Sequence, residues 1–367
     1  MKFVVSREAL LKPLQLVSGV VERRQTLPVL SNVLMVLNDD QLALTGTDLE
    51  VEILGRLQLP VPGESGEITV PARKLLDICK SLPEGSNIEF VQDEQRMLVR
   101  SGRSRFTLSC LPAAEFPSVE DSPSDLQFSC AQQEIKRLID RTAFAMAQQD
   151  VRYYLNGMLW EVRPDHLRVV ATDGHRMAMC TRPMTVNTED TVQAILPRKG
   201  VMELSRLLDD SESGVDVSLS ANHIRLSTGE YTFTSKLVDG KFPDYERVLP
   251  RGGTNVVFGN RDELKQAFAR TAILSNEKYR GVRLLLGEGS LTLVANNPEQ
   301  EEAEETVSVE YAGDALEMGF NVSYLMDVAN VISSEKIKLT LSDANSSALI
   351  EEQDGGDSVY VVMPMRL

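Results

Sequence analysis

The sequence contains little of the chemistry on which enzymes, disulfide-stabilised proteins and membrane proteins depend. Its 367 residues include one tryptophan, three histidines and four cysteines, and only 5% of them are aromatic. No apolar run approaches the roughly 20 residues of a membrane span, and no signal-peptide pattern follows Lys2. The cysteines are far apart in the sequence and form no CxxC pair, which is typical of free thiols in a reducing compartment: Cys79, Cys110, Cys130 and Cys180. We therefore expect a cytoplasmic protein without disulfides.

Short motifs that hold nucleotides or metals are also missing. The sequence has no GxxxxGK[ST] loop, no GxGxxG, no HExxH and no EF-hand loop, and its histidines are not spaced as metal ligands. Residues 333–336 match SxxK, but no SDN or KTG element accompanies them. Asp48 and Glu50 resemble half of a metal-binding carboxylate pair, yet a two-metal site needs several converging carboxylates. We interpret Asp48 as a turn-stabilising residue and expect neither a cofactor, nor a metal, nor catalysis.

What the sequence does contain is one pattern that recurs three times, at intervals of about 120 to 130 residues, far longer than a solenoid repeat. Three polar tripeptides occupy the same relative place: Gly46-Thr47-Asp48, Ala171-Thr172-Asp173 and Ala295-Asn296-Asn297. Three pairs close the copies: Phe116-Pro117, Phe242-Pro243 and Met363-Pro364. We expect three domains of ordinary size, with boundaries at 1–122, 123–250 and 251–367.

Each copy is expected to contain two helices and several strands. Leu10, Leu14 and Val17 recur at the spacing of a one-sided helix, whereas residues 105–108 and 231–234 alternate as half-buried strands do. The predicted helices are 7–24, 71–83, 133–150, 197–208, 261–280 and 321–334. The predicted fold class is α+β, with three tandem repeats of a two-helix domain backed by sheets.

The predicted helices and the rest of the chain carry net charges of opposite sign. The net charge of −16 at first argues against a nucleic-acid partner. However, the six predicted helices carry a net charge of +7, and the rest of the chain carries −23. If the helices line one surface, that surface attracts phosphates while the exterior repels them.

Several long segments closely resemble the bacterial β sliding clamp family, the processivity subunits of DNA polymerase III. The resemblance covers essentially the whole chain and is carried by Val70–Lys74, Gln149–Met158, Ala171–Arg176, Phe233–Tyr245, Ala272–Lys278 and Tyr360–Leu367. It implies a homodimeric, head-to-tail ring with helices inside and sheets outside, opened by an ATP-driven loader. It also implies a non-catalytic protein of the bacterial cytoplasm, associated with the nucleoid during replication and not with a membrane.

Helix packing agrees with two copies in such a ring. Helices packed about 8 to 10 Å apart would leave a free circle about 9 Å wide if six lined it, and about 28 Å wide if twelve did. Only the wider circle admits a DNA duplex. One chain cannot encircle DNA, whereas two can.

The resemblance implies two binding sites. Sequence-independent contact with encircled duplex DNA is assigned to Arg24, Arg73, Gln149, Tyr153 and Tyr154, with packing between strands as the alternative for the two tyrosines. A cleft for short, largely apolar peptides of the replicative polymerase, clamp loader, translesion polymerases, and mismatch-repair and ligase-type factors is assigned to Leu155, Thr172, Gly174, His175, Arg176, Met177, Pro243, Arg247, Val248, Ser347, Val361, Met363, Pro364, Met365 and Arg366. Met177 and Asn345 depart from residues familiar in the family.

A dimer interface is predicted between opposite ends of the chain. Arginines cluster near residues 96–105 and glutamates near residues 299–305, a complementary pair of patches for a head-to-tail contact. The resemblance places Phe106 and Leu108 against Ile273 and Leu274 at this contact. The predicted interface comprises Arg103, Arg105, Phe106, Leu108, Ile273, Leu274, Glu302 and Glu305.

Two other functions are compatible with parts of this pattern. A DNA-modifying enzyme would need a catalytic constellation, which the sequence does not offer. An acidic scaffold that binds only proteins would show no dependence on DNA topology. The sliding-clamp interpretation accounts for the triplication, the cationic helices and the missing motifs together.

Overall fold

The computed structural model describes residues 1–22, 27–117 and 123–366. Within them the order of the regular elements is the same in every copy: one strand, a helix, four strands, a second helix and three strands. The first copy comprises β1 (Lys2–Ser6), α1 (Arg7–Gly19), β2 (Asn32–Asn38), β3 (Gln41–Thr47), β4 (Val51–Gln58), β5 (Gly66–Pro71), α2 (Ala72–Ser81), β6 (Asn87–Asp93), β7 (Arg96–Ser101) and β8 (Ser104–Ser109).

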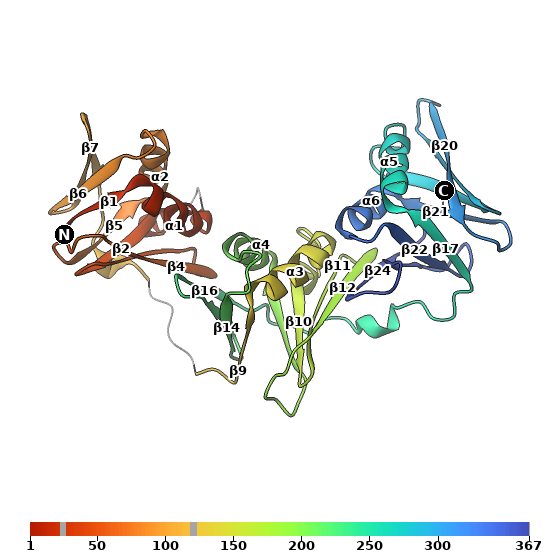
Figure 1. Cartoon of the computed structure of the whole chain (residues 1–367), viewed down its shortest axis with the longest axis horizontal. Coiled ribbons are helices and arrows are strands. Elements are labelled where there is room, and N and C mark those ends of the chain that lie inside the picture. The colour runs from red at the N-terminus through yellow and green to blue at the C-terminus, as the bar shows by residue number, and fades with distance from the viewer. Residues whose placement is uncertain (23–26, 118–122, 367) are drawn as a thin grey trace. The chain divides into compact units, whose positions relative to one another are not determined.

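The other two copies repeat this order (Figure 1). The second comprises β9 (Leu126–Ala131), α3 (Gln132–Thr142), β10 (Gly157–Arg163), β11 (His166–Thr172), β12 (Arg176–Pro183), β13 (Val192–Pro197), α4 (Arg198–Leu207), β14 (Gly214–Leu219), β15 (His223–Ser227) and β16 (Tyr231–Lys236). The third comprises β17 (Asn255–Asn260), α5 (Arg261–Ala272), β18 (Gly281–Gly287), β19 (Ser290–Asn296), β20 (Glu302–Glu310), β21 (Leu316–Asn321), α6 (Val322–Val331), β22 (Lys336–Leu341), β23 (Ala348–Glu352) and β24 (Ser358–Val362). The predicted fold class, three tandem α+β repeats, is confirmed.

The first helix of each copy is shorter than predicted. These helices end at Gly19, Thr142 and Ala272 rather than at residues 24, 150 and 280. After α3 the chain tightens into a 3-10 turn, η3 (Ala143–Ala145), and leaves it in an extended conformation. After α5 the backbone N–H groups of residues 273–275 donate three residues back, and the Asn276 side chain then accepts from the two N–H groups of residues 278 and 279. Apolar spacing continues through such turns, which is why the sequence pattern overestimated the helices.

The chain divides into two compact units, and the division passes through the second copy. Unit 1 contains residues 1–136 and 199–237, and unit 2 contains residues 137–198 and 238–367. Unit 1 holds an eight-stranded sheet in the order β5-β2-β3-β4-β16-β15-β14-β9 and a four-stranded sheet in the order β1-β6-β7-β8. Unit 2 holds a twelve-stranded sheet in the order β13-β10-β11-β12-β24-β23-β22-β17-β20-β19-β18-β21.

Each unit contains one junction at which a sheet continues from one copy into the next. In unit 1, β4 pairs antiparallel with β16, from Gly55 opposite Tyr231 to Val51 opposite Ser235. In unit 2, β12 pairs antiparallel with β24, from Arg176 opposite Val362 to Cys180 opposite Ser358. In both cases the fourth strand of one copy meets the last strand of the next.

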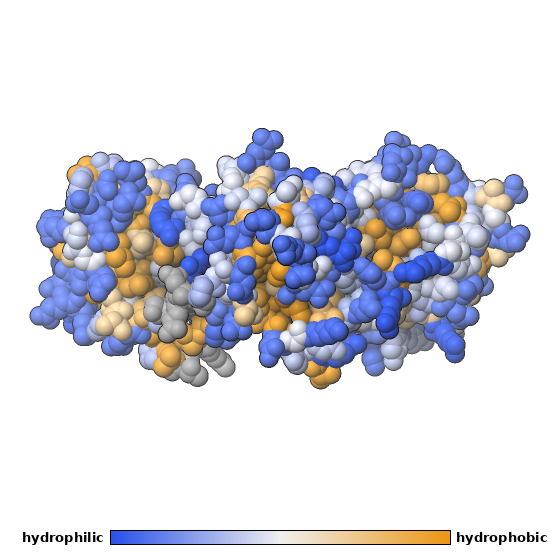
Figure 2. All heavy atoms as spheres, turned by 90° about the horizontal axis from the view of Figure 1, so that it is seen from below, coloured by the Kyte–Doolittle hydropathy of each residue, from blue (hydrophilic) through white to orange (hydrophobic). Residues whose placement is uncertain are grey.

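Apolar side chains on one face of the helices and sheets form the cores. α1 buries Leu10, Leu14 and Val17 against β3 and β4, and the largest fully buried side chains of unit 2 include Trp160 and Tyr360. On the face shown in Figure 2, hydrophilic residues predominate and hydrophobic residues show between them. No described helix is long and apolar enough to cross a membrane.

The four cysteines are free thiols, as predicted. Three of them are buried and Cys130 is partly so. Burial raises the pKa of Cys79, Cys130 and Cys180 to about 12. These thiols therefore stay protonated at physiological pH and contribute to packing rather than to reactivity.

Candidate functional site

The turn after β11 shapes one side of the candidate site. The Asp173 Oδ1 atom accepts hydrogen bonds from the backbone N–H groups of His175 (2.9 Å) and Arg176 (3.1 Å). The Thr172 hydroxyl donates to the Arg176 carbonyl (2.6 Å), and Gly174 occupies the left-handed region with a φ of 87°. A Cβ atom at Gly174 would be strained and would lie 3.0 Å from the Arg152 guanidinium. Glycine thus allows the turn and the arginine to approach each other.

The same turn occurs in the first copy and settles the role of Asp48. Its Oδ1 atom accepts from the backbone N–H groups of Glu50 (2.9 Å) and Val51 (2.7 Å). In the third copy the Asn297 side-chain oxygen accepts from the N–H of Glu301 (2.9 Å). Asp48 is therefore a turn-stabilising residue, as predicted.

A loop before β10 forms the opposite side. The Asn156 side chain accepts from the Asp150 N–H (2.9 Å) and donates to the Asp150 carbonyl (2.8 Å). The Arg152 guanidinium binds both Asp150 carboxylate oxygens, at 3.0 and 2.9 Å. Hydrogen bonds from Arg152, first from its side chain and then from its backbone, lower the pKa of Asp150 to about 2. The loop is thus held by its own polar contacts before any ligand binds.

Between this loop and this turn lies an apolar pocket of about 160 Å³. It is lined by Arg152, Tyr154, Leu155, Thr172, Gly174, Arg176, Pro243, Val248, Val361 and Met363. Beneath it lies a buried cluster that includes Leu159, Val170, Phe242 and Val361. A concave, mostly apolar wall with a few polar groups is typical of a site that binds an apolar side chain or small ligand.

The structure brings together about half of the residues predicted for peptide binding. Those that line the pocket are Leu155, Thr172, Gly174, Arg176, Pro243, Val248, Val361 and Met363. Those that do not are His175, Met177, Arg247, Ser347, Pro364, Met365 and Arg366. Met177 belongs to the core below the pocket and is 2% exposed, whereas His175 contributes its carbonyl, which accepts from the Met363 N–H (3.0 Å).

Arg176 is anchored rather than free. Its guanidinium donates to Asp173, to Asp327 of α6 and to the carbonyl of Phe144, and its plane lies 4.3 Å from the centre of the Tyr324 ring. We predicted directional contacts to a peptide from this side chain. In the structure its donors are used within the protein.

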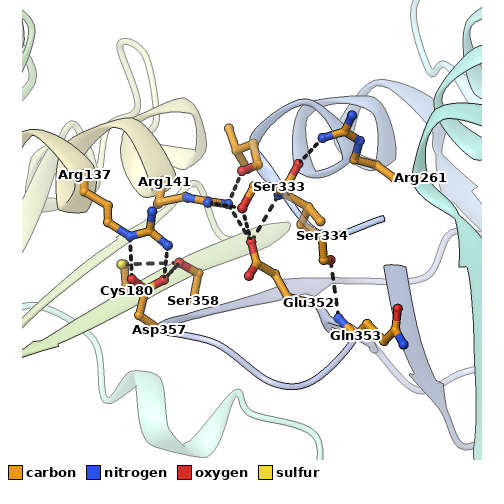
Figure 3. A network of polar contacts seen from close by, with 12 residues as sticks. Arg137, Arg141, Cys180, Arg261, Ser333, Ser334, Glu352, Gln353, Asp357 and Ser358 are labelled. Carbon is orange, nitrogen blue, oxygen red and sulfur yellow. Dashed lines mark hydrogen bonds and ion pairs between the residues drawn. The ribbon is translucent and has the colours of Figure 1, made fainter. Parts of the chain in front are cut away.

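A second polar network closes the far end of the β12–β24 pair (Figure 3). The Asp357 carboxylate accepts from Arg137 (2.6 Å), and Arg141 donates to Glu352 (3.0 Å). Asp357 also accepts from Arg182 (3.1 Å). Burial alone would raise the pKa of Asp357, but the hydrogen bonds from Arg137 and Ser358 and the nearby arginine charges outweigh it and lower the pKa. The junction in unit 2 is therefore fastened by arginines at both ends.

The residues predicted for DNA contact fall into three places. Arg73 is exposed on α2 of unit 1, and Arg24 lies outside the described residues. Gln149, Tyr153 and Tyr154 lie in the loop before β10, partly within the 3-10 turn η4 (Tyr153–Leu155). Tyr153 is 56% exposed and meets Tyr154 edge to face at 5.8 Å. Tyr154 packs beside the core cluster and lines the pocket, so the packing alternative describes it better than Tyr153.

The residues predicted for the dimer interface lie on or beside β8, on β20 and in the turn after α5. β8 is the last strand of its sheet, and within the described residues its outer edge has no partner strand. β20 pairs with β19 along residues 302–308, whereas only Val309 and Glu310 face β17. Ile273 is 75% exposed. Leu108 is 7% exposed within its own sheet, and Glu305 already pairs with Arg270 of the same chain.

Three family models match the three copies in order. They describe the N-terminal domain of the DNA polymerase III beta subunit at residues 1–120, its central domain at 129–244 and its C-terminal domain at 246–366. The chain belongs to the DNA polymerase III beta subunit family. It is 65% identical to the beta sliding clamp of Pseudomonas aeruginosa and 64% identical to that of Pseudomonas putida, each over the whole of both chains. A crystal structure of the P. aeruginosa sliding clamp bound to griselimycin covers all of both chains with a TM-score of 0.97 and 65% identity.

This beta-subunit family membership confirms the resemblance found in the sequence. Arg152 was missed as a pocket residue, and Tyr154 was assigned only to DNA contact. A signal was available, because both residues lie within three positions of Leu155 in the same short loop. The third-copy partners of Arg176 could not be found in this way, since they lie far away in the sequence.

Proposed function

We propose that two copies of this chain form a closed, head-to-tail ring around duplex DNA and act as a non-catalytic sliding clamp. The ring would confer processivity on the replicative DNA polymerase. The family membership supports this function, and one observation supports the ring most directly: the rule by which the copies pair.

Both internal junctions join the fourth strand of one copy to the last strand of the next, β4 to β16 and β12 to β24. The corresponding strands left over are β20 of the third copy and β8 of the first. Within the described residues, the outer edge of β8 has no partner strand, and β20 is unpaired along residues 302–308 on the side away from β19. An open edge strand is a template for pairing with another chain. Pairing β20 of one chain with β8 of another repeats the rule a third time, and two such contacts close a ring.

The side chains at these edges are complementary. Arg103 and Arg105 flank or occupy β8, and glutamates including Glu302 occupy the open part of β20. Ile273, which is 75% exposed, and its neighbour Leu274 would supply the apolar area on the β20 side of the contact. Phe106 and Leu108 would supply it on β8. Glu305, also predicted for this interface, pairs with Arg270 of its own chain. The apolar contacts would hold the interface, while the charges favour the correct partner edge and register.

Replacing the apolar contact tests the interface. We expect Ile273→Ala with Leu274→Ala to sediment as a monomer at micromolar concentration, whereas the unchanged chain sediments as a dimer. Val61→Ala provides a control, because Val61 is 68% exposed in unit 1, away from β8. A dimeric mass for the double variant would refute this interface.

DNA contact would be electrostatic and weak. The side chains assigned to DNA contact by the resemblance are scattered, and none is assigned to recognise base edges in a groove. They are Arg24, Arg73, Gln149, Tyr153 and Tyr154. Binding to short linear duplexes should therefore be weak and should fall steeply as salt rises. Fluorescence anisotropy at several salt concentrations measures this, and tight, salt-resistant binding would contradict the proposal.

The pocket in unit 2 would dock polymerases, the clamp loader, translesion polymerases and mismatch-repair and ligase-type factors through short apolar peptide segments. Arg247, whose side chain is 86% exposed beside the pocket residue Val248, could meet the polar end of such a segment. His175, Ser347, Pro364, Met365 and Arg366 would contribute from the margin. Griselimycin, which binds the P. aeruginosa relative, is a suitable probe. Val248→Asp should abolish its binding, and Val61→Asp should not.

The proposed domain boundaries are 1–122, 123–250 and 251–367. The matched family ranges, which break between 120 and 129 and between 244 and 246, support them. The division into two compact units follows a different line, because sheets continue across the junctions between copies. Limited proteolysis tests the second boundary: if the copies are the domains, cleavage should occur first near residues 249–254.

A further inference from the structure

The outer edge of β1 in unit 1 is closed at one end only. β1 pairs with β6 on its inner side. On the other side, Lys2 and Glu64 exchange two backbone hydrogen bonds, of 3.0 and 2.8 Å. Alternate residues of an antiparallel strand face the same neighbour, so Val4 and Ser6 face this outer side as Lys2 does. Beyond the bridge, no backbone hydrogen bond joins β1 to any described residue on that side.

Two prolines explain why the ladder stops at the bridge. Continuing the register of the bridge would place Pro62 opposite Val4. The next position of the same kind, opposite Ser6, would hold Pro60. Proline has no backbone N–H, so neither residue can donate a hydrogen bond to β1. The chain's own segment therefore separates from the strand instead of pairing with it.

The third copy shows the same edge without a proline. Val4 and Phe258 each lie two residues before the N-cap of the first helix of their copy. Phe258 of β17 pairs with Glu310 of β20. The registers of β3 with β4 and of β19 with β20 make Pro60 the equivalent of Glu310. A residue that pairs in the third copy is thus replaced by one that cannot, and the edge of the first copy stays open.

The separation leaves a groove of about 670 Å³ beside β1. β1, with Lys2, forms one wall, and residues 58–64 form the other. Each wall carries an exposed valine, since Val4 is 47% and Val61 is 68% exposed. An unpaired strand edge is a template for another extended chain. Here the N–H groups of Val4 and Ser6 would supply hydrogen bonds, and the two valines would supply apolar contacts.

The wall formed by residues 58–64 is anchored and acidic. The Leu59 N–H donates to the Asp40 carbonyl (2.7 Å), and the Asp40 carboxylate accepts from the side chain of Gln58 (3.0 Å), which lines the groove. Glu64 closes the other end of this wall, and residues 57–72 contain no lysine or arginine. A positively charged residue therefore complements the wall, and the groove is shaped before anything binds.

We propose that this groove docks an extended segment of a partner protein, which adds as a strand to the open edge of β1. The segment carries apolar, β-branched side chains at alternate positions to meet the two valines, and a lysine or arginine to complement the acidic wall. Pro60 and Pro62 keep the site open by preventing the wall from pairing with β1. The site belongs to unit 1 alone and is independent of the pocket in unit 2.

A synthetic peptide tests this docking on the full-length protein. The probe is Lys-Val-Thr-Val-Thr-Val-Lys with acetyl and amide ends. We expect it to slow hydrogen exchange of the Val4 and Ser6 amides about tenfold or more, and to leave the amides of β17 unchanged. The same peptide with glutamate in place of lysine should bind about fivefold more weakly. Unchanged exchange at Val4 and Ser6 with millimolar peptide would overturn the proposal.

Backbone methylation of the peptide distinguishes strand pairing from general apolar contact. One variant carries N-methyl groups on its valines and the other carries them on its threonines. Only alternate N–H groups of a strand face its neighbour, so one variant should lose affinity about tenfold while the other binds as the parent does. Equal affinity of both variants and the parent, or equal losses in both, would contradict strand addition.

Replacing the prolines tests what keeps the groove open. Pro60→Val with Pro62→Val restores two N–H groups to the wall. We expect slow exchange at Val4 without peptide and a loss of peptide affinity of about tenfold or more. Protection of the β6 amides checks that the sheet is intact. Pro164→Val is the control, because Pro164 is exposed in the turn between β10 and β11 of unit 2.

Two results of this experiment would overturn the proposal. The first is undiminished peptide binding and fast exchange at Val4 in the double proline variant. The second is slow exchange at Val4 in the unchanged chain without peptide, since that would show that the edge is not open.

Discussion

The two internal junctions of the chain share a backbone and differ in chemistry. In unit 1, the Lys236 N–H donates to the Glu50 carbonyl (2.8 Å), directly after β16 has paired with β4. In unit 2, the Met363 N–H donates to the His175 carbonyl (3.0 Å), directly after β24 has paired with β12. Lys236 and Met363 therefore occupy equivalent places, as do Glu50 and His175.

The side chains at these equivalent positions make only the unit 2 junction suitable for binding an apolar ligand. In unit 1 the Lys236 ammonium pairs with Glu50 at 3.4 Å, so the equivalent position carries an ion pair. In unit 2 Met363 forms part of an apolar pocket wall. Methionine is flexible and adapts to several ligands, whereas an ion pair must be broken and desolvated before anything apolar replaces it. Triplication supplied the geometry, and a few substitutions made one junction a candidate docking site.

The largest effect should come from placing the glutamate and lysine of the unit 1 junction at the equivalent positions of unit 2. We expect His175→Glu with Met363→Lys to weaken griselimycin binding about 100-fold or more, because charged groups would have to be desolvated at the pocket. Calorimetric titration measures the loss. The reciprocal change in unit 1, Glu50→His with Lys236→Met, should leave binding unchanged. Equal losses in the two variants would show that the comparison is mistaken.

A second difference concerns how strongly each junction is held. Arg141→Ala should destabilise unit 2 by about 3 kcal/mol, because it leaves Glu352 without a guanidinium in a largely buried network. The side chains of Arg141 and Glu352 are only 8% and 15% exposed. Lys199, which pairs with Asp48 and Glu22 in unit 1, is 32% exposed, and Lys199→Ala should cost about 1 kcal/mol or less.

Native-state hydrogen exchange on the amides of β24 and β16 separates these two costs. It reports each unit alone, whereas one global unfolding curve does not describe a chain with several folding units. Equal loss of protection in both strands would contradict the ranking.

The turns offer a smaller contrast. Gly174 has a φ of 87°, and Leu49 at the equivalent place in the first copy has a φ of 77°. Gly174→Ala should cost about 1 kcal/mol, because alanine resists that conformation and its Cβ would approach Arg152. Leu49→Gly should be neutral or slightly stabilising, as glycine removes the same strain. Hydrogen exchange at the two turns checks both values, and a cost for Leu49→Gly as large as that for Gly174→Ala would refute the strain argument.

The smallest effect concerns a buried acid beside the first junction. Burial raises the pKa of Glu203, which is 6% exposed on α4 and bonds Arg206 at 2.8 Å. An acid with a raised pKa binds more protons in the folded state, so its unfavourable contribution is present at neutral pH and disappears as pH falls. Glu203→Gln should therefore stabilise unit 1 by about 0.5 kcal/mol at pH 7 and by nothing below about pH 4. Hydrogen exchange of the β4 amides at both pH values measures this stabilisation. A larger stabilisation by Glu203→Gln in acid than at pH 7 would contradict the raised pKa of Glu203.

Asp357 in unit 2 should behave in the opposite way. Its pKa is lowered, so its contribution is complete above the ordinary aspartate value near 4 and is lost as pH falls through the folded value. Protection of β24 should thus decline in acid more than that of β16. Asp357→Asn should remove most of this decline.

The sequence was sufficient for the repeated architecture because each copy carries the same local signals. The Asx turns at Asp48 and Asp173 are made by side chains bonding to backbone groups within three residues, so a tripeptide predicts them. The alternating strands and the starts of the helices follow for the same reason. The helix ends did not, since the 3-10 turns after α3 and α5 keep the apolar spacing of a helix.

The site was predictable only in outline. Leu155 and Val361 were found through the family resemblance, and both line the pocket. The anchoring of Arg176 by Asp327 was not, because that contact joins residues 151 positions apart and leaves no local pattern. Likewise, nothing near Glu305 in the sequence indicates that Arg270 already pairs with it. Long-range partners decide whether a charged residue is free to bind.

The most direct test of the account asks whether topology holds the protein on DNA. The protein is loaded by a clamp loader onto nicked circular duplex, and the bound fraction is followed before and after a restriction enzyme linearises the DNA. We predict that the protein stays on the circle and slides off once an end is available. Retention on the linear molecule would mean ordinary surface binding and would contradict the ring.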